Sequence, residues 1–325
     1  MESNSKKIFS ERKTTGLTWY QVAFEWEDEY SKILNLEIAE MSAPYTEDTK
    51  KTICGEAANI LRPFRIKKDN WNIAQVMYPR LSYRYRKLSV IPIYLDVPKK
   101  WVKKIIWETR KLPIYFVTCY DAYEMIKGMG KENCSYLPLS IPDRCHEKIV
   151  PTKEFDVIQI GRKNSVLHEY MMKYCACHPN VEYVYRDNGG YRSTIRGLIG
   201  EAVTREDYMN LLKKAKISLV STPAVDGEKD FGGFDFFTPR FFESVACYCH
   251  LIGRYTDNSE AGFFNMKSIC KNIITYDMFE KCIEEKLAIS CLENLSNYTQ
   301  FINTNLTSAR AEKVKDELRN AGILI

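Results

Sequence analysis

Residues 232–252 read GGFDFFTPRFFESVACYCHLI, and this stretch decides the fold. Thr238 followed by Pro239 marks the start of a helix, because threonine caps helix N-termini and proline is favoured at the first helical position. The next turns place two phenylalanines, a valine and an alanine on one face. A short apolar strand then begins at His250. A helix that leads directly into a buried strand indicates an α/β domain with a parallel sheet.

The rest of the chain repeats this pattern. Short apolar runs predict buried strands at residues 73–78, 90–95, 114–118, 157–160, 181–185, 217–220 and 273–276. Segments with helical periodicity lie between most of them, which is typical of parallel sheets covered on both faces. A polar, proline-bracketed stretch near residues 139–154 marks a boundary. We therefore predict an α/β protein with two Rossmann-like domains facing a central cleft, at residues 1–150 and 151–325, the second of which ends in a C-terminal helix.

Composition favours a folded protein with reduced cysteines. A chain of 325 residues with 45% hydrophobic residues is long enough for two packed domains. The net charge of +5 is too small to indicate a nucleic-acid partner. No apolar run approaches the ~20 residues of a membrane span, and residues 1–13 lack a secretory signal. Eleven cysteines, an odd number, favour reduced thiols, and we expect a cytoplasmic protein.

Two cysteine pairs invite a metal interpretation. Residues 175–178 and 247–250 both read C-x-C-H. This spacing differs from that of structural zinc sites, and free cysteine is among the most buried residue types. We therefore interpret the pairs as core thiols and expect no metal.

Positive charge is concentrated in residues 51–111, which hold 15 basic and 4 acidic residues, a net +11 against −6 for all other residues. A helix at residues 98–110 places Trp101, Val102, Ile105 and Ile106 in one stripe with lysines around it and Trp107 outside it. Basic residues beside a tryptophan suit a lipid headgroup region, so we predict peripheral contact with an anionic membrane. The alternative is an ordinary helix with solvated lysines.

Two strand-to-helix junctions carry polar groups suited to an anion. After the strand at 157–160 come Gly161, Arg162 and Lys163, with Ser165 as the expected cap of the next helix. Free backbone N–H groups, a helix dipole and two cations favour phosphate. The alternative is a surface loop with solvated cations. At the second junction, Thr204 and Asp207 resemble a capping box, and residues 200–202 form a loop that can present backbone groups to a flat ring.

The helix after Thr238 has a polar face that includes Glu243, and Asp235 precedes the helix with seven residues between the two carboxylates. This D-x7-E pattern, leading into ESVAC and the strand from His250, resembles the E-x7-E helix of group 1 glycosyltransferases, the large retaining family with the GT-B fold. Residues 160–162 are similar to its phosphate-binding Gly-Arg turn, and 200–222 to its base-binding loop, helix and strand. The resemblance covers the second half well and the first half loosely, at residues 115–118 and 136–142.

The resemblance implies a role for each matching residue. Glu243 would bind the ribose hydroxyls of a nucleotide sugar, and Asp235 would lie beside the transferred sugar. Arg162 would contact the diphosphate. The other implied donor-binding residues are Gly161 at the turn, Glu201 in the base-binding loop, and Thr238 and Pro239 at the helix start. The family's phosphate lysine would fall near His168, so His168 or Lys163 must replace it. The usual Gly-rich loop near the N-terminus is missing.

These features predict a retaining, metal-independent glycosyltransferase of the hexosyltransferase type. It would use a nucleoside-diphosphate sugar as donor, need no cofactor, and modify a saccharide or lipid-linked saccharide, in surface polysaccharide or glycan biosynthesis. Asp96 ends the strand at 90–95, and we predict that it orients the acceptor hydroxyl. The alternative for Asp96 is a helix cap.

Two other functions compete with this prediction. A nucleotide-sugar epimerase would keep the fold and act on the donor alone. A non-catalytic membrane or nucleic-acid adaptor would use the basic segment and leave both carboxylates without a role, so we expect no nucleic acid. The adaptor surface would comprise Arg62, Arg65, Lys67, Lys68, Arg80, Arg84, Arg86 and Lys87, interleaved with Tyr83 and Tyr85.

Overall fold

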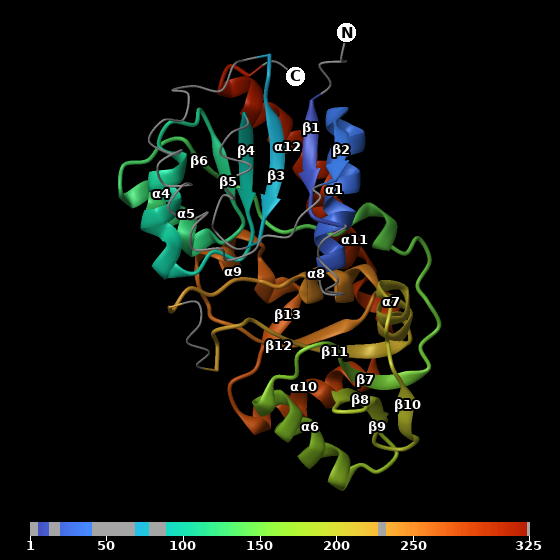
Figure 1. Cartoon of the computed structure of the whole chain (residues 1–325). Helices are drawn as coiled ribbons and strands as arrows, with labels where there is room; N and C mark the ends of the chain where they lie inside the picture. The colour runs from blue at the N-terminus through green and yellow to red at the C-terminus, as the bar shows by residue number, and fades with distance from the viewer. Residues whose placement is uncertain (1–5, 13–19, 41–68, 78–88, 227–231, 324–325) are drawn as a thin grey trace. The chain divides into compact units, whose positions relative to one another are not determined.

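The structure is a computed structural model that describes residues 6–12, 20–40, 69–77, 89–226 and 232–323. It is an α/β protein with two compact units, each built on its own sheet (Figure 1). The first unit comprises Met1–Pro142, Lys229–Phe234 and Thr307–Ile325. The second comprises Asp143–Glu228 and Asp235–Leu306.

The first unit has a parallel sheet in the order β2-β1-β3-β4-β5-β6. Its strands β3 and β4 follow the predicted apolar runs, and every residue of β4 is buried. The strands are β1 (Lys7–Ser10), β2 (Glu37–Glu40), β3 (Asn72–Val76), β4 (Val90–Tyr94), β5 (Tyr115–Val117) and β6 (Cys134–Tyr136). The helices are α1 (Gln21–Leu34), α4 (Val102–Thr109), α5 (Tyr120–Gly128) and α12 (Thr307–Asn320), and the short 3-10 turn η2 (Lys99–Trp101) precedes α4. The 3-10 turn η3 (Asp143–Cys145) begins the second unit.

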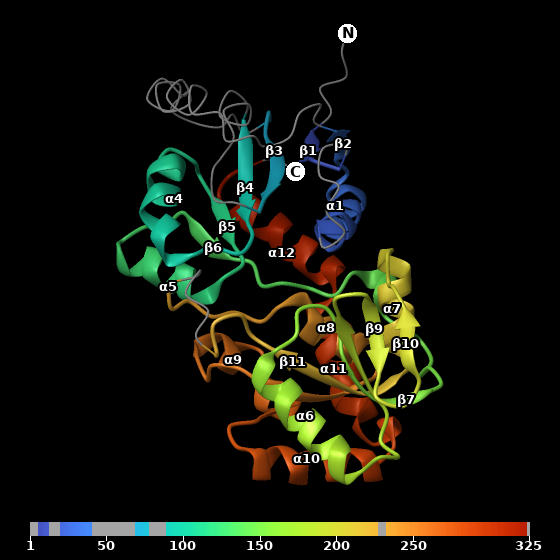
Figure 2. The ribbon, with the colours of Figure 1, turned by 60° about the horizontal axis from the view of Figure 1, so that its bottom comes forward.

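The second unit has a sheet in the order β10-β9-β8-β7-β11-β12-β13, parallel except for the hairpin β9–β10. Helices α6 and α10 cover one face, and α7, α8 and α11 pack together on the other (Figure 2). The strands are β7 (Phe155–Gln159), β8 (Tyr183–Asp187), β9 (Gly190–Ser193), β10 (Gly197–Gly200), β11 (Ala215–Ser221), β12 (His250–Arg254) and β13 (Cys270–Asn272). The helices are α6 (Ser165–Cys177), α7 (Arg205–Lys213), α8 (Pro239–Ala246), α9 (Ser259–Phe263), α10 (Tyr276–Ala288) and α11 (Leu295–Asn305).

The C-terminal helix α12 belongs to the first unit, whereas the sequence predicted it in the second. The backbone N–H and the hydroxyl of Thr307 both donate to the Ile141 carbonyl, at 2.9 and 3.0 Å. The apolar stripe Ala311, Val314 and Leu318 is fully buried, and α12 packs on α1. The sequence predicted the boundary between the domains at residue 150. In the structure the first segment of the first unit ends eight residues earlier, at Pro142.

One predicted strand was misplaced. The strand β13 ends at Asn272, so the apolar run 273–276 follows it. The end of this run already belongs to the start of α10, where Thr275 is the N-cap and accepts a hydrogen bond from the Met278 N–H at 3.3 Å. The hairpin β9–β10 was not predicted, since its glycine-rich strands lack a continuous apolar run.

The basic helix packs on its own unit. In η2 and α4, Val102 and Ile105 are fully buried, so the apolar stripe faces the core. Trp107 is 46% exposed, with the Arg110 guanidinium 3.6 Å from its ring centroid. The predicted adaptor residues from Arg62 to Lys87 lie outside the described residues. Within the described ranges, no helix is both long and apolar enough to cross a membrane.

Candidate functional site

The second unit has a switch point in its sheet between β7 and β11. The chain passes from β7 to β8 on one side and later returns to β11 on the other. Ligands of open parallel sheets bind at such a point, beyond the carboxyl ends of the strands. The loops that follow β7, β11 and β12 therefore form the candidate site, together with the N-termini of α6 and α8.

The turn after β7, where the sequence predicts an anion site, begins with a left-handed glycine. Gly161 has a φ of +70°, a conformation that glycine adopts without strain. Its N–H donates to the hydroxyl of Tyr191 on β9, at 3.3 Å. The helix α6 is capped by Asn164, whose Oδ1 accepts from the Leu167 N–H at 2.9 Å. The sequence predicted Ser165 as the cap, which is one residue after the observed cap, Asn164. Asparagine and serine both cap helices well, so the two positions could not be told apart from the sequence.

Arg240 lies across this turn, a role that the sequence did not reveal. Its Nη1 donates to the Arg162 carbonyl at 2.6 Å, and a Cβ added to Gly161 would meet its Cδ at 3.5 Å. Burial lowers the pKa of the Arg240 guanidinium. No acidic side chain of the described residues forms an ion pair with it. The charge of Glu243 raises the pKa of this guanidinium, but Glu243 is itself paired with Arg205. A bound anion would therefore stabilise the partly buried cation.

The other cations at the turn differ in kind. Arg162 and Lys163 are exposed, and the Lys163 Nζ lies 5.1 Å from the centroid of the Tyr185 ring. The His168 Nδ1 is 3.0 Å from the Tyr183 hydroxyl. Burial, helped by the charge of Lys163, lowers the pKa of His168 to about 4. His168 is therefore neutral at pH 7, which leaves Lys163 or Arg240 to supply the cation.

Glu243 lies inside the second unit. Its Oε1 is 2.6 Å from the Arg205 Nη2, and its Oε2 accepts a hydrogen bond from the Tyr208 hydroxyl at 3.0 Å. The carboxylate thereby joins α8 to the first turns of α7, which follow the predicted base-binding loop. The capping box of Thr204 and Asp207 at the start of α7 is confirmed. Glu201 in that loop is exposed.

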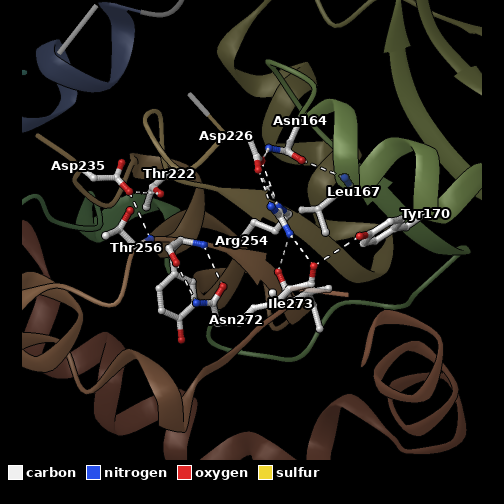
Figure 3. Close-up of polar contacts among 12 residues, drawn as sticks. Asn164, Leu167, Tyr170, Thr222, Asp226, Asp235, Arg254, Thr256, Asn272 and Ile273 are labelled. Atoms are coloured by element: carbon white, nitrogen blue, oxygen red, sulfur yellow. Dashed lines mark hydrogen bonds and ion pairs between the residues drawn. The ribbon is translucent and has the colours of Figure 1, made fainter. Parts of the chain in front are cut away.

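Asp235 is 2% exposed and is bound by neighbouring loops (Figure 3). Its Oδ2 accepts from the Thr222 hydroxyl at 2.5 Å and from the Thr256 N–H at 3.3 Å. Its Oδ1 accepts from the Ala224 N–H at 3.0 Å. The carboxylate thus connects the loops after β11 and β12, and its place beside the transferred sugar stays a prediction.

A second network holds the same edge of the sheet, with Arg254 at its centre (Figure 3). The Arg254 Nη2 is 2.5 Å from the Asp226 Oδ1, and its Nη1 donates to the Ile273 carbonyl at 2.9 Å. The Asn164 Nδ2 donates to the Asp226 Oδ2 at 2.5 Å. The ion pair therefore fixes the loops after β11 and β13 against the cap of α6.

The helix α8 begins at Pro239 with Thr238 at the N-cap, as predicted. The Thr238 side chain does not cap the helix. Its Oγ1 is buried and finds no hydrogen-bond partner in the described part of the chain. A buried hydroxyl without a partner at a helix N-terminus is suited to a ligand oxygen.

In the first unit, the predicted residue Asp96 follows β4 with a φ of +49°. The N-cap of η2 is Pro98, so Asp96 is not a cap. Burial raises the pKa of the Asp96 carboxyl to about 6.

The cysteine pairs do not form a metal site in the described residues. No three His, Cys, Asp or Glu side chains of this part of the chain are arranged to hold a metal ion. Cys247 and Cys249 are buried, Cys175 is half-buried, and Cys177 is exposed. The prediction of core thiols is therefore wrong for Cys177.

Several solved structures share this architecture at low sequence identity. The T4 phage BGT in complex with its UDP-glucose substrate has a TM-score of 0.50 and 12% identity, covering 99% of this chain and 98% of that one. A UDP-N-acetylglucosamine 2-epimerase has a TM-score of 0.53 and 9% identity, covering 98% and 97%. The GtfA/B complex has a TM-score of 0.51 and 10% identity over 84% of this chain.

The chain has the GT-B fold. It spans 60% of the length of the matched chain in the GtfA/B complex. No protein-family model matches the sequence, and no curated protein matches it either. The likeness therefore establishes two Rossmann-like domains, while activity is argued from the residues of the site.

Proposed function

We propose that the protein is a glycosyltransferase that uses a nucleoside-diphosphate sugar, bound at the switch point of the second unit. The observation that carries this proposal is the partly buried Arg240 guanidinium, which lies over the left-handed Gly161 turn and forms no ion pair with an acidic side chain of the described residues. The turn, the N-termini of α6 and α8, and the orphan hydroxyl of Thr238 add donors for phosphate oxygens. The structure of T4 phage BGT in complex with its UDP-glucose substrate, which shares the fold, supports a nucleotide sugar as the ligand.

Charge develops on the diphosphate as the glycosidic bond breaks, and donors fixed in advance stabilise that charge. We assign this role to Arg162, Lys163 and Arg240. The acceptor proposed from the sequence is a saccharide or a lipid-linked saccharide. Retention of configuration, as implied by the group 1 resemblance, would need Asp235 beside the sugar. Hydrogen bonds to Thr222, Ala224 and Thr256 hold the Asp235 carboxylate in place, and its position beside the sugar stays a prediction.

The first prediction tests the donor site. We expect that, among UDP, GDP, ADP, CMP and their sugars, the nucleotides of one base raise the melting temperature of the protein. A nucleotide at 100 times its Kd stabilises the fold by ~2.7 kcal/mol. Arg240→Ala should weaken that nucleotide's affinity about 10–100-fold in calorimetry, since a hydrogen bond to a charged group contributes ~1.5–3 kcal/mol. Arg319→Ala, on α12 of the first unit, serves as the control and should leave affinity unchanged. No shift with any nucleotide would contradict the proposal.

Product analysis separates the transferase from the epimerase, whose fold is the same. A transferase releases the free nucleoside diphosphate when an acceptor or water takes the sugar. An epimerase changes the sugar and keeps the nucleotide sugar intact. Chromatography and mass spectrometry of the reaction mixture distinguish the two outcomes.

We further propose that the exposed lysines of η2 and α4 dock the protein on an anionic membrane that presents the acceptor. Lys99, Lys100 and Lys103 are exposed beside Trp107, whereas the apolar stripe faces the core. Contact is therefore electrostatic, at about 1 kcal/mol per lysine near anionic lipid.

The second prediction concerns this surface. The protein should sediment with anionic vesicles at low salt and dissociate at high salt, because salt screens surface charge. Changing Lys99, Lys100 and Lys103 together to Gln should lower binding about 10–100-fold. A control triple variant with the same change in charge alters the exposed residues Lys267, Lys271 and Lys281. Equal losses in both variants would show a general charge effect and contradict this docking surface.

A further inference from the structure

A buried tyrosine of the hairpin β9–β10 reaches the turn after β7. The hairpin lies at one edge of the second sheet (Figure 2). Its residue Tyr191 is 5% exposed, and its hydroxyl contacts Gly161. The pairing of the two strands is irregular opposite this tyrosine, because the register shifts between Leu198 and Gly200. Bulges of this kind redirect side chains and are common next to functional sites.

Two glycines hold this part of the hairpin in one conformation. Gly190 and Gly200 both have a φ of +119°, which residues with a side chain rarely adopt. A Cβ added to Gly190 would lie 2.5 Å from the Gly200 carbonyl oxygen, so the two strands approach too closely for any other residue. This close approach fixes the backbone beside Tyr191.

The Tyr191 hydroxyl occupies an N–H group that the turn would otherwise offer to an anion. The Gly161 N–H donates to the hydroxyl oxygen at 3.3 Å. Arg240 borders the same glycine, since a Cβ added to Gly161 would meet its Cδ at 3.5 Å. The tyrosine hydroxyl and the guanidinium side chain are thus gathered at one residue of the turn.

The proton of this hydroxyl is the group left for a ligand. A tyrosine hydroxyl both accepts and donates, and here the Gly161 N–H uses its acceptor side. Within the described residues the hydroxyl has no acceptor for its own proton. Burial raises the pKa of Tyr191, against the lowering effects of the Gly161 N–H, Arg186 and Arg240, so the hydroxyl keeps its proton at neutral pH. A buried donor without an acceptor is suited to a ligand oxygen.

We infer that the Tyr191 hydroxyl binds the diphosphate of the nucleotide sugar, an inference that rests on the proposed function. Its oxygen accepts from the Gly161 N–H, and its proton is donated to a phosphate oxygen. The hydroxyl thereby extends the donor of the turn to the ligand, and the bond that it accepts strengthens the bond that it donates. It adds direction without charge, because the nearby cations supply the charge.

Titration calorimetry of Tyr191→Phe tests this contact. UDP, GDP and ADP are first titrated into the wild type to find the diphosphate that binds. The variant should bind that diphosphate about 10–100-fold more weakly, the range expected for a hydrogen bond to a charged group. It should bind the corresponding nucleoside (uridine, guanosine or adenosine) as the wild type does, because the nucleoside has no phosphate. Phenylalanine keeps the ring, so the variant should keep its fold, which its melting temperature checks.

Tyr248→Phe is the matched control. Tyr248 is 4% exposed, and its hydroxyl lies 3.3 Å from the His146 Nε2. This residue precedes β12, so it lies at the edge of the sheet opposite the turn. The control removes a comparable buried hydroxyl and should keep the wild-type affinity for the diphosphate.

Removing the Tyr191 hydroxyl also frees the Gly161 N–H, which gives the test an opposite outcome. If the tyrosine only fills the turn, the freed N–H binds phosphate directly, and the diphosphate affinity of Tyr191→Phe stays unchanged or rises. That result overturns the inference while the proposed function stands. Equal weakening of the diphosphate and the nucleoside would show a purely structural role and overturn it as well. If the wild type binds none of the nucleotides, the proposed function fails and the inference falls with it.

Discussion

Glu243→Ala should lower the free energy of unfolding by about 3–5 kcal/mol, the usual cost of removing one partner from a buried ion pair. The Glu243 side chain is 3% exposed and that of Arg205 is 14% exposed. Without the carboxylate, Arg205 loses the charge that lies 2.6 Å away, and the Tyr208 hydroxyl loses its acceptor. Chemical denaturation followed by circular dichroism measures the change.

The control is a pair on the surface of the same unit. Glu147 and Lys213 are 2.7 Å apart, and each side chain is 29% exposed. Glu147→Ala should therefore cost no more than about 1 kcal/mol. The double variant Glu243→Ala with Arg205→Ala should be less destabilised than the two single effects added together, because the residues interact directly. Equal losses for Glu243→Ala and Glu147→Ala would show that the buried pair contributes little.

This arrangement bears on the predicted ribose contact. A carboxylate has about four acceptor positions, and Arg205 and Tyr208 use one on each oxygen of Glu243. A ribose hydroxyl can therefore still donate to Glu243 without displacing either partner. The ribose role stays a prediction, and the ion pair shows that Glu243 also joins α8 to α7.

The sequence predicted the layers of the second unit well because their signals are local. The strands β7 and β11 are buried on both faces, so their sequences are rich in apolar residues on both faces. The capping box at Thr204 is contained within four residues. The start of α8 follows from the Thr-Pro pair at 238–239 alone.

The features that the sequence missed depend on contacts between distant residues. The stripe on α12 predicts a covered helix but does not reveal which unit covers it. From the sequence, Arg240 is only one of several polar residues on the helix that begins at Pro239. In the structure its side chain contacts the turn at Gly161, 79 positions earlier in the chain. Asp235 matches a family position by spacing, yet its partners Thr222 and Thr256 belong to two other loops. A motif fixes where a residue lies along the chain, and the surrounding loops decide what its side chain contacts.

Asp235→Ala should lower the free energy of unfolding by about 3–5 kcal/mol, because hydrogen bonds to a charged group contribute ~1.5–3 kcal/mol each. The substitution leaves the hydroxyl of Thr222 and the N–H groups of Ala224 and Thr256 without their acceptor. Asp257→Ala is the control, because this exposed carboxylate pairs with Lys267 at the surface and should contribute less than about 1 kcal/mol. Urea denaturation of both variants gives the comparison.

Asp235→Asn separates a structural role from a catalytic one. The amide oxygen can still accept from the Ala224 N–H, and the Thr222 hydroxyl can turn to accept from the amide nitrogen. The Thr256 N–H, at 3.3 Å from the carboxylate, then faces a donor. We expect a loss of about 1–2 kcal/mol with turnover within tenfold of the wild type, since one weak contact and the charge are lost. A variant that is as stable as the wild type but inactive would instead place Asp235 at the transferred sugar and restore the expectation from the sequence motif.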